Sequence, residues 1–302
     1  KVEFLDLYPL TFTEFLQAMG EDALVDLQQQ KQWDLITVFK TKYIQLLRQY
    51  YYVGGMPEVV VRYSQNRDLN EVRQIQQQIL DSYEQDFSKH APADVVPRIR
   101  MVWNSIPSQL ARENKKFVYG LIKQGARAKD FELALAWLMD CGLVHKISRV
   151  SKPALPLKAY EDFGAFKLFI LDTGLLAAMV NLDVKTLLDG NELFEEFKGA
   201  LSEQYVLQQL VADKRVSLYY WSAEKSTAEI DFLIQYRDRV IPIEVKAEEN
   251  LQAKSLRSFV QKYMPKIAIR SSMSDFREEE WLTNFPLYSV CELTTYIKDK
   301  QV

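Results

Sequence analysis

The strongest constraint on the fold of this chain lies in residues 227–246, which read TAEIDFLIQYRDRVIPIEVK. Short apolar runs lie on both sides of a polar turn at Arg237–Asp238, and acidic residues alternate with apolar ones in the EID of residues 229–231 and the IEV of residues 243–245. A period of two residues is typical of a half-buried strand. The pattern therefore predicts an antiparallel hairpin formed by residues 229–235 and 240–246.

The segments around this hairpin complete a mixed α+β pattern. Helices are expected over residues 195–213 and 254–263, and strands over residues 216–221, 266–271 and 287–290. Helix, three strands, helix and strand in that order predict a mixed central sheet with helices on its faces. We therefore expect an α/β domain over residues 151–302.

Residues 1–90 are expected to form a helical region. Thr11 is suited to cap a helix, because Glu14 follows three residues later and apolar residues then recur at helical spacing. The glutamine-rich residues 70–87 keep an apolar stripe and also predict a helix. The opening residues, KVEFLDLYPL, read as a strand already in progress, so we expect further chain before Lys1.

Residues 91–150 predict a winged-helix-like unit, with a helix at 95–105, a second within 108–121 and a third at 129–141, followed by a strand at 143–150. Basic residues gather around its second and third helices, and we select four as candidates for nucleic-acid contact: Lys115, Lys116, Lys123 and Arg127. The alternative is a solvated face on a structural module, and the nearby Asp130 and Glu132 favour it.

The composition excludes several classes of site. The net charge of −3 means that any contact with nucleic acid depends on a local basic patch. Two distant cysteines and two histidines provide neither a disulfide framework nor the ligand spacing of a zinc site. No apolar run approaches the length of about 20 residues that a membrane span needs. A cytoplasmic protein without a membrane anchor is expected.

The hairpin carries the candidate catalytic residues. Glu244 and Lys246 are two residues apart and share one face of a strand, while Asp231 and Glu229 share a face of the partner strand. If the faces match, Asp231 and Glu244 could bind Mg²⁺, which takes one or two protein carboxylates. Lys246 would then orient a water molecule, and Glu203 on the preceding helix could add a carboxylate. A salt-bridged structural hairpin is the alternative.

These residues also support a resemblance. Glu203, the EID of residues 229–231 and the IEVK of residues 243–246 resemble the PD-(D/E)XK nuclease-like core. The wider chain resembles prokaryotic AAA+ family ATPases with a DUF4143 C-terminal region, on the strength of four further pieces: Leu7-Tyr-Pro-Leu-Thr-Phe-Thr-Glu-Phe-Leu16, Gly54-Gly-Met-Pro-Glu58, Asp172-Thr-Gly-Leu175 and Gly199-Ala-Leu-Ser-Glu203.

The resemblance implies an ATPase parent whose P-loop module lies outside this chain. Residues 120–125 have the spacing of two P-loop glycines but continue with Ala126-Arg127, where Lys-Ser/Thr is needed. ATP would therefore bind only to a segment absent here, and the ATPase module of the same protein is an implied partner.

Three functions follow from this reading. The first is a module that binds DNA or a protein partner. The second is a Mg²⁺-dependent DNA endonuclease that uses Asp231, Glu244 and Lys246. The third is a purely structural role in assembling the ATPase. Whether the chain is an enzyme, and whether it forms a homo-oligomer, stay open at this point.

Overall fold

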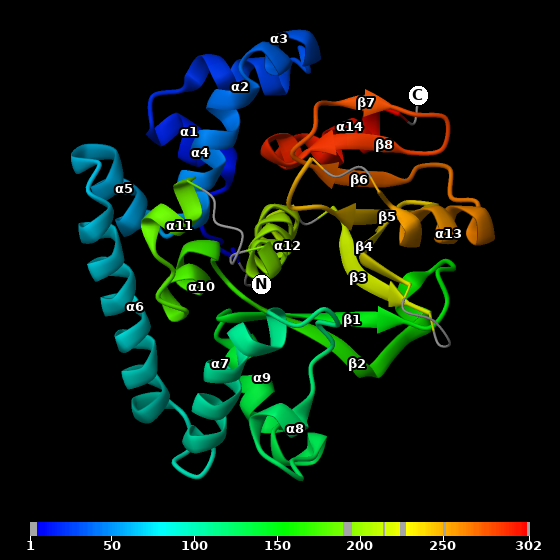
Figure 1. The fold of residues 1–302 in the computed structure, drawn as a ribbon. Coiled ribbons are helices and arrows are strands. Elements are labelled where there is room, and N and C mark those ends of the chain that lie inside the picture. Colours follow the sequence, from blue (N-terminus) through cyan, green and yellow to red (C-terminus); the bar gives the residue numbers. More distant parts are fainter. Residues whose placement is uncertain (1–4, 190–194, 214, 224–227, 250–251, 301–302) are drawn as a thin grey trace.

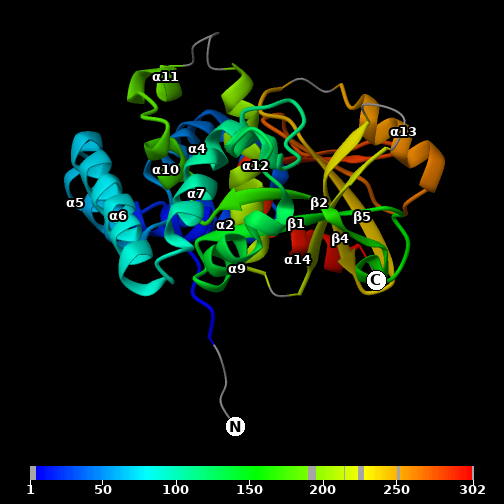
Figure 2. The ribbon, with the colours of Figure 1, turned by 90° about the horizontal axis from the view of Figure 1, so that it is seen from below.

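The computed structural model of the chain describes residues 5–189, 195–213, 215–223, 228–249 and 252–300. It confirms the predicted mixed α+β fold class, because a helical N-terminal region is joined to a large mixed sheet. Figures 1 and 2 show the long helices of the N-terminal region at one end of the molecule and the sheet at the other.

The N-terminal region is helical, as predicted. Its elements are α1 (Phe12–Ala18), α2 (Asp22–Gln29), α3 (Trp33–Val38), α4 (Lys40–Val53), α5 (Pro57–Asn66) and α6 (Leu69–His90). Thr11 caps α1 in a capping box, since the Thr11 N–H donates to the Glu14 carboxylate at 2.7 Å and the Glu14 N–H donates to Thr11 Oγ1 at 3.3 Å. The strand expected at the start of the chain is wrong for residues 5–10, which are irregular, and residues 1–4 lie outside the described residues.

The middle of the chain contains α7 (Val96–Leu110), α8 (Tyr119–Ile122) and α9 (Glu132–Asp140), followed by β1 (Val144–Val150) and β2 (Glu161–Ile170). The helix predicted within residues 108–121 is present only as the short α8, because residues 108–110 belong to α7 and residues 111–118 are not helical. The preceding segment leaves the helical path to reach the edge of the sheet, where the Phe117 N–H donates to the Phe166 carbonyl at 2.8 Å. Tertiary hydrogen bonding here overrides the local helical pattern.

Eight strands of the described chain form one sheet, in the order β2-β1-β3-β4-β5-β6-β8-β7. The remaining strands are β3 (Ser217–Ser222), β4 (Glu229–Tyr236), β5 (Arg239–Val245), β6 (Ile269–Ser272), β7 (Arg277–Glu278) and β8 (Thr283–Pro286). The predicted hairpin is confirmed as β4 and β5, which pair antiparallel with Tyr236 opposite Arg239. β1 pairs in parallel with β3, so the sheet continues across the expected boundary at residue 150.

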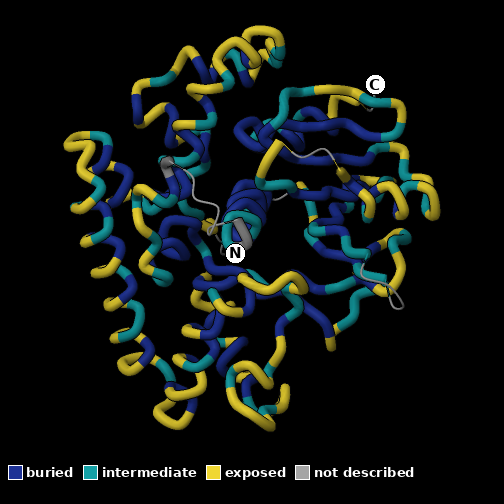
Figure 3. The backbone as a smooth tube through the Cα atoms, in the orientation of Figure 1, coloured by how far each residue is buried: buried dark blue, intermediate teal, exposed yellow. Residues whose placement is uncertain are grey.

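Helices cover both faces of the central strands. Phe232 and Ile234 of β4 join the larger hydrophobic core, together with Leu201 of α12 (Glu195–Val211). Leu233 of β4 joins a second core with Leu256 of α13 (Lys254–Tyr263). Because neighbouring residues of a strand point to opposite faces, α12 and α13 lie on opposite sides of the sheet. Figure 3 shows that α12 is buried along most of its length.

A buried polar junction ties the helical region to the sheet. Asp172 caps α10 (Thr173–Met179), and its carboxylate accepts N–H groups from Gly55 at 2.6 Å and from the Gln208 side chain at 3.0 Å. Burial raises the pKa of Asp172. Gly54 adopts φ +76°, and a Cβ there would lie 2.2 Å from Asp172 Oδ1. Sequence pieces more than 100 residues apart therefore meet at one point.

The end of the chain differs from the predicted pattern. Residues 287–290 are not a strand but belong to a 3₁₀ helix, η4 (Leu287–Glu292), followed by α14 (Leu293–Asp299). The Tyr288 carbonyl accepts the Gln28 side-chain N–H at 2.5 Å, and the Leu287 carbonyl accepts the Tyr205 hydroxyl at 3.0 Å. The segment therefore bonds to α2 and α12 instead of a strand. None of the described helices is both long and apolar enough to span a membrane.

Candidate functional site

A β-bulge aims the side chain of Asp231. The pairing of β3 with β4 shifts register between Tyr219 and Trp221, so that Asp231 and Phe232 stand together opposite the single residue Tyr220. An extra residue of this kind redirects side chains and is frequent beside functional sites. Asp231 is thereby turned, with Phe232, towards the face covered by α12.

A buried lysine lies at the centre of this face. Lys167 of β2 is fully buried, and its Nζ lies 2.5 Å from Glu229 Oε1, 3.5 Å from Glu203 Oε2 and 3.8 Å from Asp231 Oδ1. The ring of Tyr220 lies 5.0 Å from the same Nζ, within cation–π range. Glu229 and Asp231 both approach Lys167, which confirms the prediction that they share a face.

A second ammonium group completes the cluster. Lys115, in the loop before α8, forms an ion pair with Glu203, and its side chain is only 13% exposed. Glu203 therefore lies between two lysines. Burial acts to raise the pKa of Glu203, but Lys115 and Lys167 outweigh it and hold that pKa below its usual range. We call Lys115, Lys167, Glu203, Glu229 and Asp231 the carboxylate cluster.

The pKa values of two further groups in the cluster, Lys167 and Asp231, are both raised. Burial acts to lower the pKa of Lys167, but the charges of Glu203, Glu229 and Asp231 outweigh it and raise that pKa well above its usual value. Burial and the charge of Glu203 raise the pKa of Asp231 from 3.8 to about 7, against the opposing charge of Lys167. The cluster therefore favours the charged form of the Lys167 ammonium group and the protonated form of the Asp231 carboxyl group.

The predicted pair Glu244, on β5, and Lys246, directly after β5, makes different contacts from the cluster. Glu244 is buried, with Oε1 2.7 Å from Lys246 Nζ and Oε2 accepting the Leu256 N–H of α13 at 3.2 Å. Asp231 Oδ2 accepts the Val245 N–H at 2.8 Å. Thus Asp231 and Glu244 lie on adjacent strands, but Asp231 turns towards α12 and Glu244 towards α13.

Mg²⁺ is the ion that the sequence motif implies, and the observed side chains do not fit it. The ammonium group of Lys167 lies 3.8 Å from Asp231, and Asp231 and Glu244 turn towards opposite faces of the sheet. Within the described residues, no group of three or more His, Cys, Asp or Glu side chains is arranged to hold a metal ion.

The candidate nucleic-acid residues divide into two sets. Lys115 points inward to Glu203, as described above. Lys123 and Arg127 are exposed around α8, and Lys116 is half-buried. Arg127 lies 3.8 Å from Asp130, a weak surface pair. Of the four candidates, Lys116, Lys123 and Arg127 therefore remain open to solvent, at least in part.

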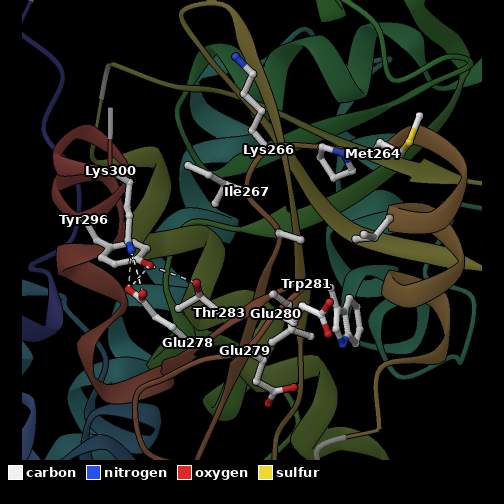
Figure 4. A pocket seen from close by; sticks show the side chains of 14 residues that line it. Met264, Lys266, Ile267, Glu278, Glu279, Glu280, Trp281, Thr283, Tyr296 and Lys300 are labelled. Atoms are coloured by element: carbon white, nitrogen blue, oxygen red, sulfur yellow. Dashed lines mark hydrogen bonds and ion pairs between the residues drawn. The ribbon is translucent and has the colours of Figure 1, made fainter. Parts of the chain in front are cut away.

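A separate cavity of about 410 Å³ lies at the other end of the sheet, beside β7, β8, α13 and α14. Figure 4 shows Trp281 and Glu280 on one side of it, and Tyr296, Glu278 and Lys300 on the other. None of the predicted site residues lines this cavity. Glu278 pairs with Lys300 at 2.8 Å, so much of the charge along its wall is already compensated.

Sequence reasoning missed Lys167. Its signal was a lysine within the otherwise apolar run Ala165–Ile170, spaced two residues from Ala165 and Phe169, both of which are buried. A charged residue in a buried strand needs a partner. That partner could not be identified, because the carboxylates come from distant parts of the chain.

Two family comparisons cover most of the chain. Residues 44–186 match the family described as Domain of unknown function (DUF8612), and residues 198–290 match Domain of unknown function (DUF4143). The DUF4143 region suggested by the sequence is thus confirmed over residues 198–290. No curated protein matches the chain, and no solved structure matches it either. The cluster joins the two matched regions, with Lys115 and Lys167 from the first and the carboxylates from the second.

Proposed function

We propose that this chain is a DNA-binding module with a nuclease-like sheet that does not cleave its ligand. In this proposal it is the C-terminal portion of an AAA+ family ATPase, and ATP binds to a segment outside the chain. The order of the sequence pieces that resemble such ATPases supports this placement, as does the DUF4143 match. A protein partner in place of DNA is the nearest alternative.

The position of Lys167 carries the proposal. Metal-assisted phosphodiester hydrolysis needs a dication between carboxylates, where it polarises the phosphate and activates water. Here a fully buried ammonium group lies among Glu203, Glu229 and Asp231. Its raised pKa keeps it charged at neutral pH, so a dication would have to displace a permanent charge. Binding without cleavage fits this arrangement best.

The exposed basic surface supplies the contact with DNA in this proposal. Lys123 and Arg127 are exposed and can reach phosphate groups, and Lys116 lies on the same unit. Each phosphate contact releases counterions, so affinity falls steeply as salt is raised. The overall charge of −3 confines binding to this local patch.

Fluorescence anisotropy with labelled duplex DNA tests the proposal. The double variant K123Q/R127Q should bind more weakly than wild type and lower the slope of log K against log salt by about two, because each removed phosphate contact is worth about one. K262Q removes an exposed lysine from α13 and is the matched control, with an unchanged slope. K115Q should destabilise the fold but leave the slope unchanged, since Lys115 faces the cluster.

The same preparation separates the alternatives. Cleavage of DNA by the wild type with Mg²⁺ or Mn²⁺, lost in D231A and K246A, would refute the proposal in favour of an endonuclease. The hydrogen bond from the Val245 N–H to Asp231 favours that alternative in one respect, because it holds Asp231 next to Glu244 in space. Absence of both DNA affinity and cleavage would instead favour a protein partner or a structural role.

A further inference from the structure

We propose that the cavity beside β7, β8, α13 and α14 binds a guanidinium group, carried either by a free small molecule or by an arginine side chain of a peptide. The cavity lies at the other end of the sheet from the carboxylate cluster and shares none of its residues. This inference therefore goes beyond the proposed function and does not depend on it.

The cavity has the size and the mixed lining of a small-ligand site. Its volume of about 410 Å³ falls within the range of about 300–1,000 Å³ that is usual for such sites. Val260, Ile267 and Ala268 contribute apolar groups to the wall, and Trp281 and Tyr296 contribute aromatic rings. Figure 4 shows these two rings on opposite sides of the cavity. A ligand can therefore meet aromatic side chains from two directions.

Trp281 provides a ring that attracts cations. It is half-buried, and the guanidinium carbon of Arg257, on α13, lies 5.9 Å from the ring, within cation–π range. Arg257 does not line the cavity, so it approaches Trp281 from outside. Tryptophan binds cations better than the other aromatic residues do, and a flat guanidinium group stacks on its ring. A guanidinium group inside the cavity can use the part of the same ring that lines it.

Two of the three acidic side chains in the cavity wall are neutralised within the chain. Glu278 forms an ion pair with Lys300, whose Nζ lies 2.8 Å from Glu278 Oε1. Glu279 Oε1 lies 2.9 Å from Nη2 of the buried Arg270 and 2.8 Å from Nη2 of Arg277. These two acids therefore leave little negative charge for a ligand.

Glu280 keeps its charge available. Its side chain is exposed, and in the described part of the chain no basic side chain forms an ion pair with it. Figure 4 shows Glu280 and Trp281 next to one another on one side of the cavity, while Lys266 extends away from both. A guanidinium group bound here would stack on the indole ring and donate two hydrogen bonds to the carboxylate. The two neighbouring side chains together select a flat cation.

Saturation-transfer NMR on the whole chain tests the inference. The probe is the N-acetyl amide of arginine, and the same derivative of citrulline is the matched control, because a neutral urea of nearly the same shape replaces the guanidinium group. The arginine derivative should bind at least about tenfold tighter than the citrulline derivative. E280Q should weaken binding of the arginine derivative at least about fivefold. E132Q removes an exposed carboxylate from α9 and should leave the affinity unchanged.

A second variant and a second probe complete the test. W281F keeps an aromatic ring in the wall and should weaken binding of the arginine derivative by about two- to fivefold. Methylguanidine identifies the source of the ligand: an affinity equal to that of the arginine derivative assigns the site to a free small molecule, and a weaker affinity assigns it to an arginine side chain of a peptide. Equal binding of the arginine and citrulline derivatives, no binding of the arginine derivative, or an E280Q affinity equal to that of wild type overturns the inference.

Discussion

Asp231 should make the protein less stable as the pH rises, and the substitution D231N should remove this effect. Burial and the charge of Glu203 raise the pKa of Asp231 from 3.8, its ordinary value, to about 7. Between these pH values the folded state binds more protons at this site than the unfolded state does. The stabilisation is therefore complete below about pH 4 and is lost as the pH rises through 7.

The magnitude follows from the size of the shift. One pKa unit corresponds to about 1.4 kcal/mol, so a shift of about three units makes Asp231 destabilising by up to about 4 kcal/mol above pH 7. Asparagine keeps an oxygen that can accept the Val245 N–H, which Asp231 accepts at 2.8 Å. D231N should thus exceed wild type in unfolding free energy at pH 8, and the difference should shrink towards pH 4.5.

Urea denaturation at pH 4.5, 6 and 8 provides the measurement. The titration of Glu203 does not interfere with this measurement. Its pKa is lowered, so the stability that Glu203 contributes is lost only at pH values below about 4.5. E280Q, which removes an exposed carboxylate, is the control for loss of one negative charge. A difference between D231N and wild type that is independent of pH, or a D231N variant less stable than wild type at pH 8, would refute the reasoning.

Two further predictions concern stability. K167M leaves the carboxylates without their buried partner and should lower the unfolding free energy at pH 8 by about 3–5 kcal/mol. K246M removes a lysine whose side chain is 33% exposed and should lower the unfolding free energy by less than about 1 kcal/mol. Equal losses for the two variants in urea denaturation would contradict the burial argument. G54A should be destabilising by about 3 kcal/mol or more, because the new Cβ would lie 2.2 Å from Asp172 Oδ1 at a φ of +76°. G199A, in α12 with open space around it, should instead be stabilising by about 0.5–1 kcal/mol, so thermal shifts of opposite sign are expected.

The sequence predicted those parts of the fold that depend on neighbours along the chain. The hairpin of β4 and β5 follows from two short apolar runs and the polar turn between them, and the bounds of α13 agree with the prediction to the residue. The cap of α1 by Thr11 also depends on contacts within four residues. Such features are fixed by backbone geometry and local burial, which a short window of sequence contains.

Local pattern failed where residues from distant elements bonded to the same segment. The segment 108–121 has helical spacing, but Phe117 instead donates its backbone N–H to Phe166 of β2. Residues 287–290 have an apolar run suited to a strand, but their carbonyls accept Gln28 and Tyr205. In both places hydrogen bonds from elsewhere in the fold decided the backbone path.

The candidate site divides along the same line. Residue type and spacing were enough to select Glu203, Asp231, Glu244 and Lys246 and to place Glu229 beside Asp231. The position of Lys167 among the carboxylates depends on the sheet order. The pairing of β1 with β3, which are far apart in sequence, places β2 and β4 in the same sheet. The bulge at Asp231 then turned that carboxyl towards Lys167 and away from the face on which Glu244 lies. An alternating strand pattern assigns side chains to faces only where the register is regular. The face to which Asp231 points was therefore decided by the tertiary structure.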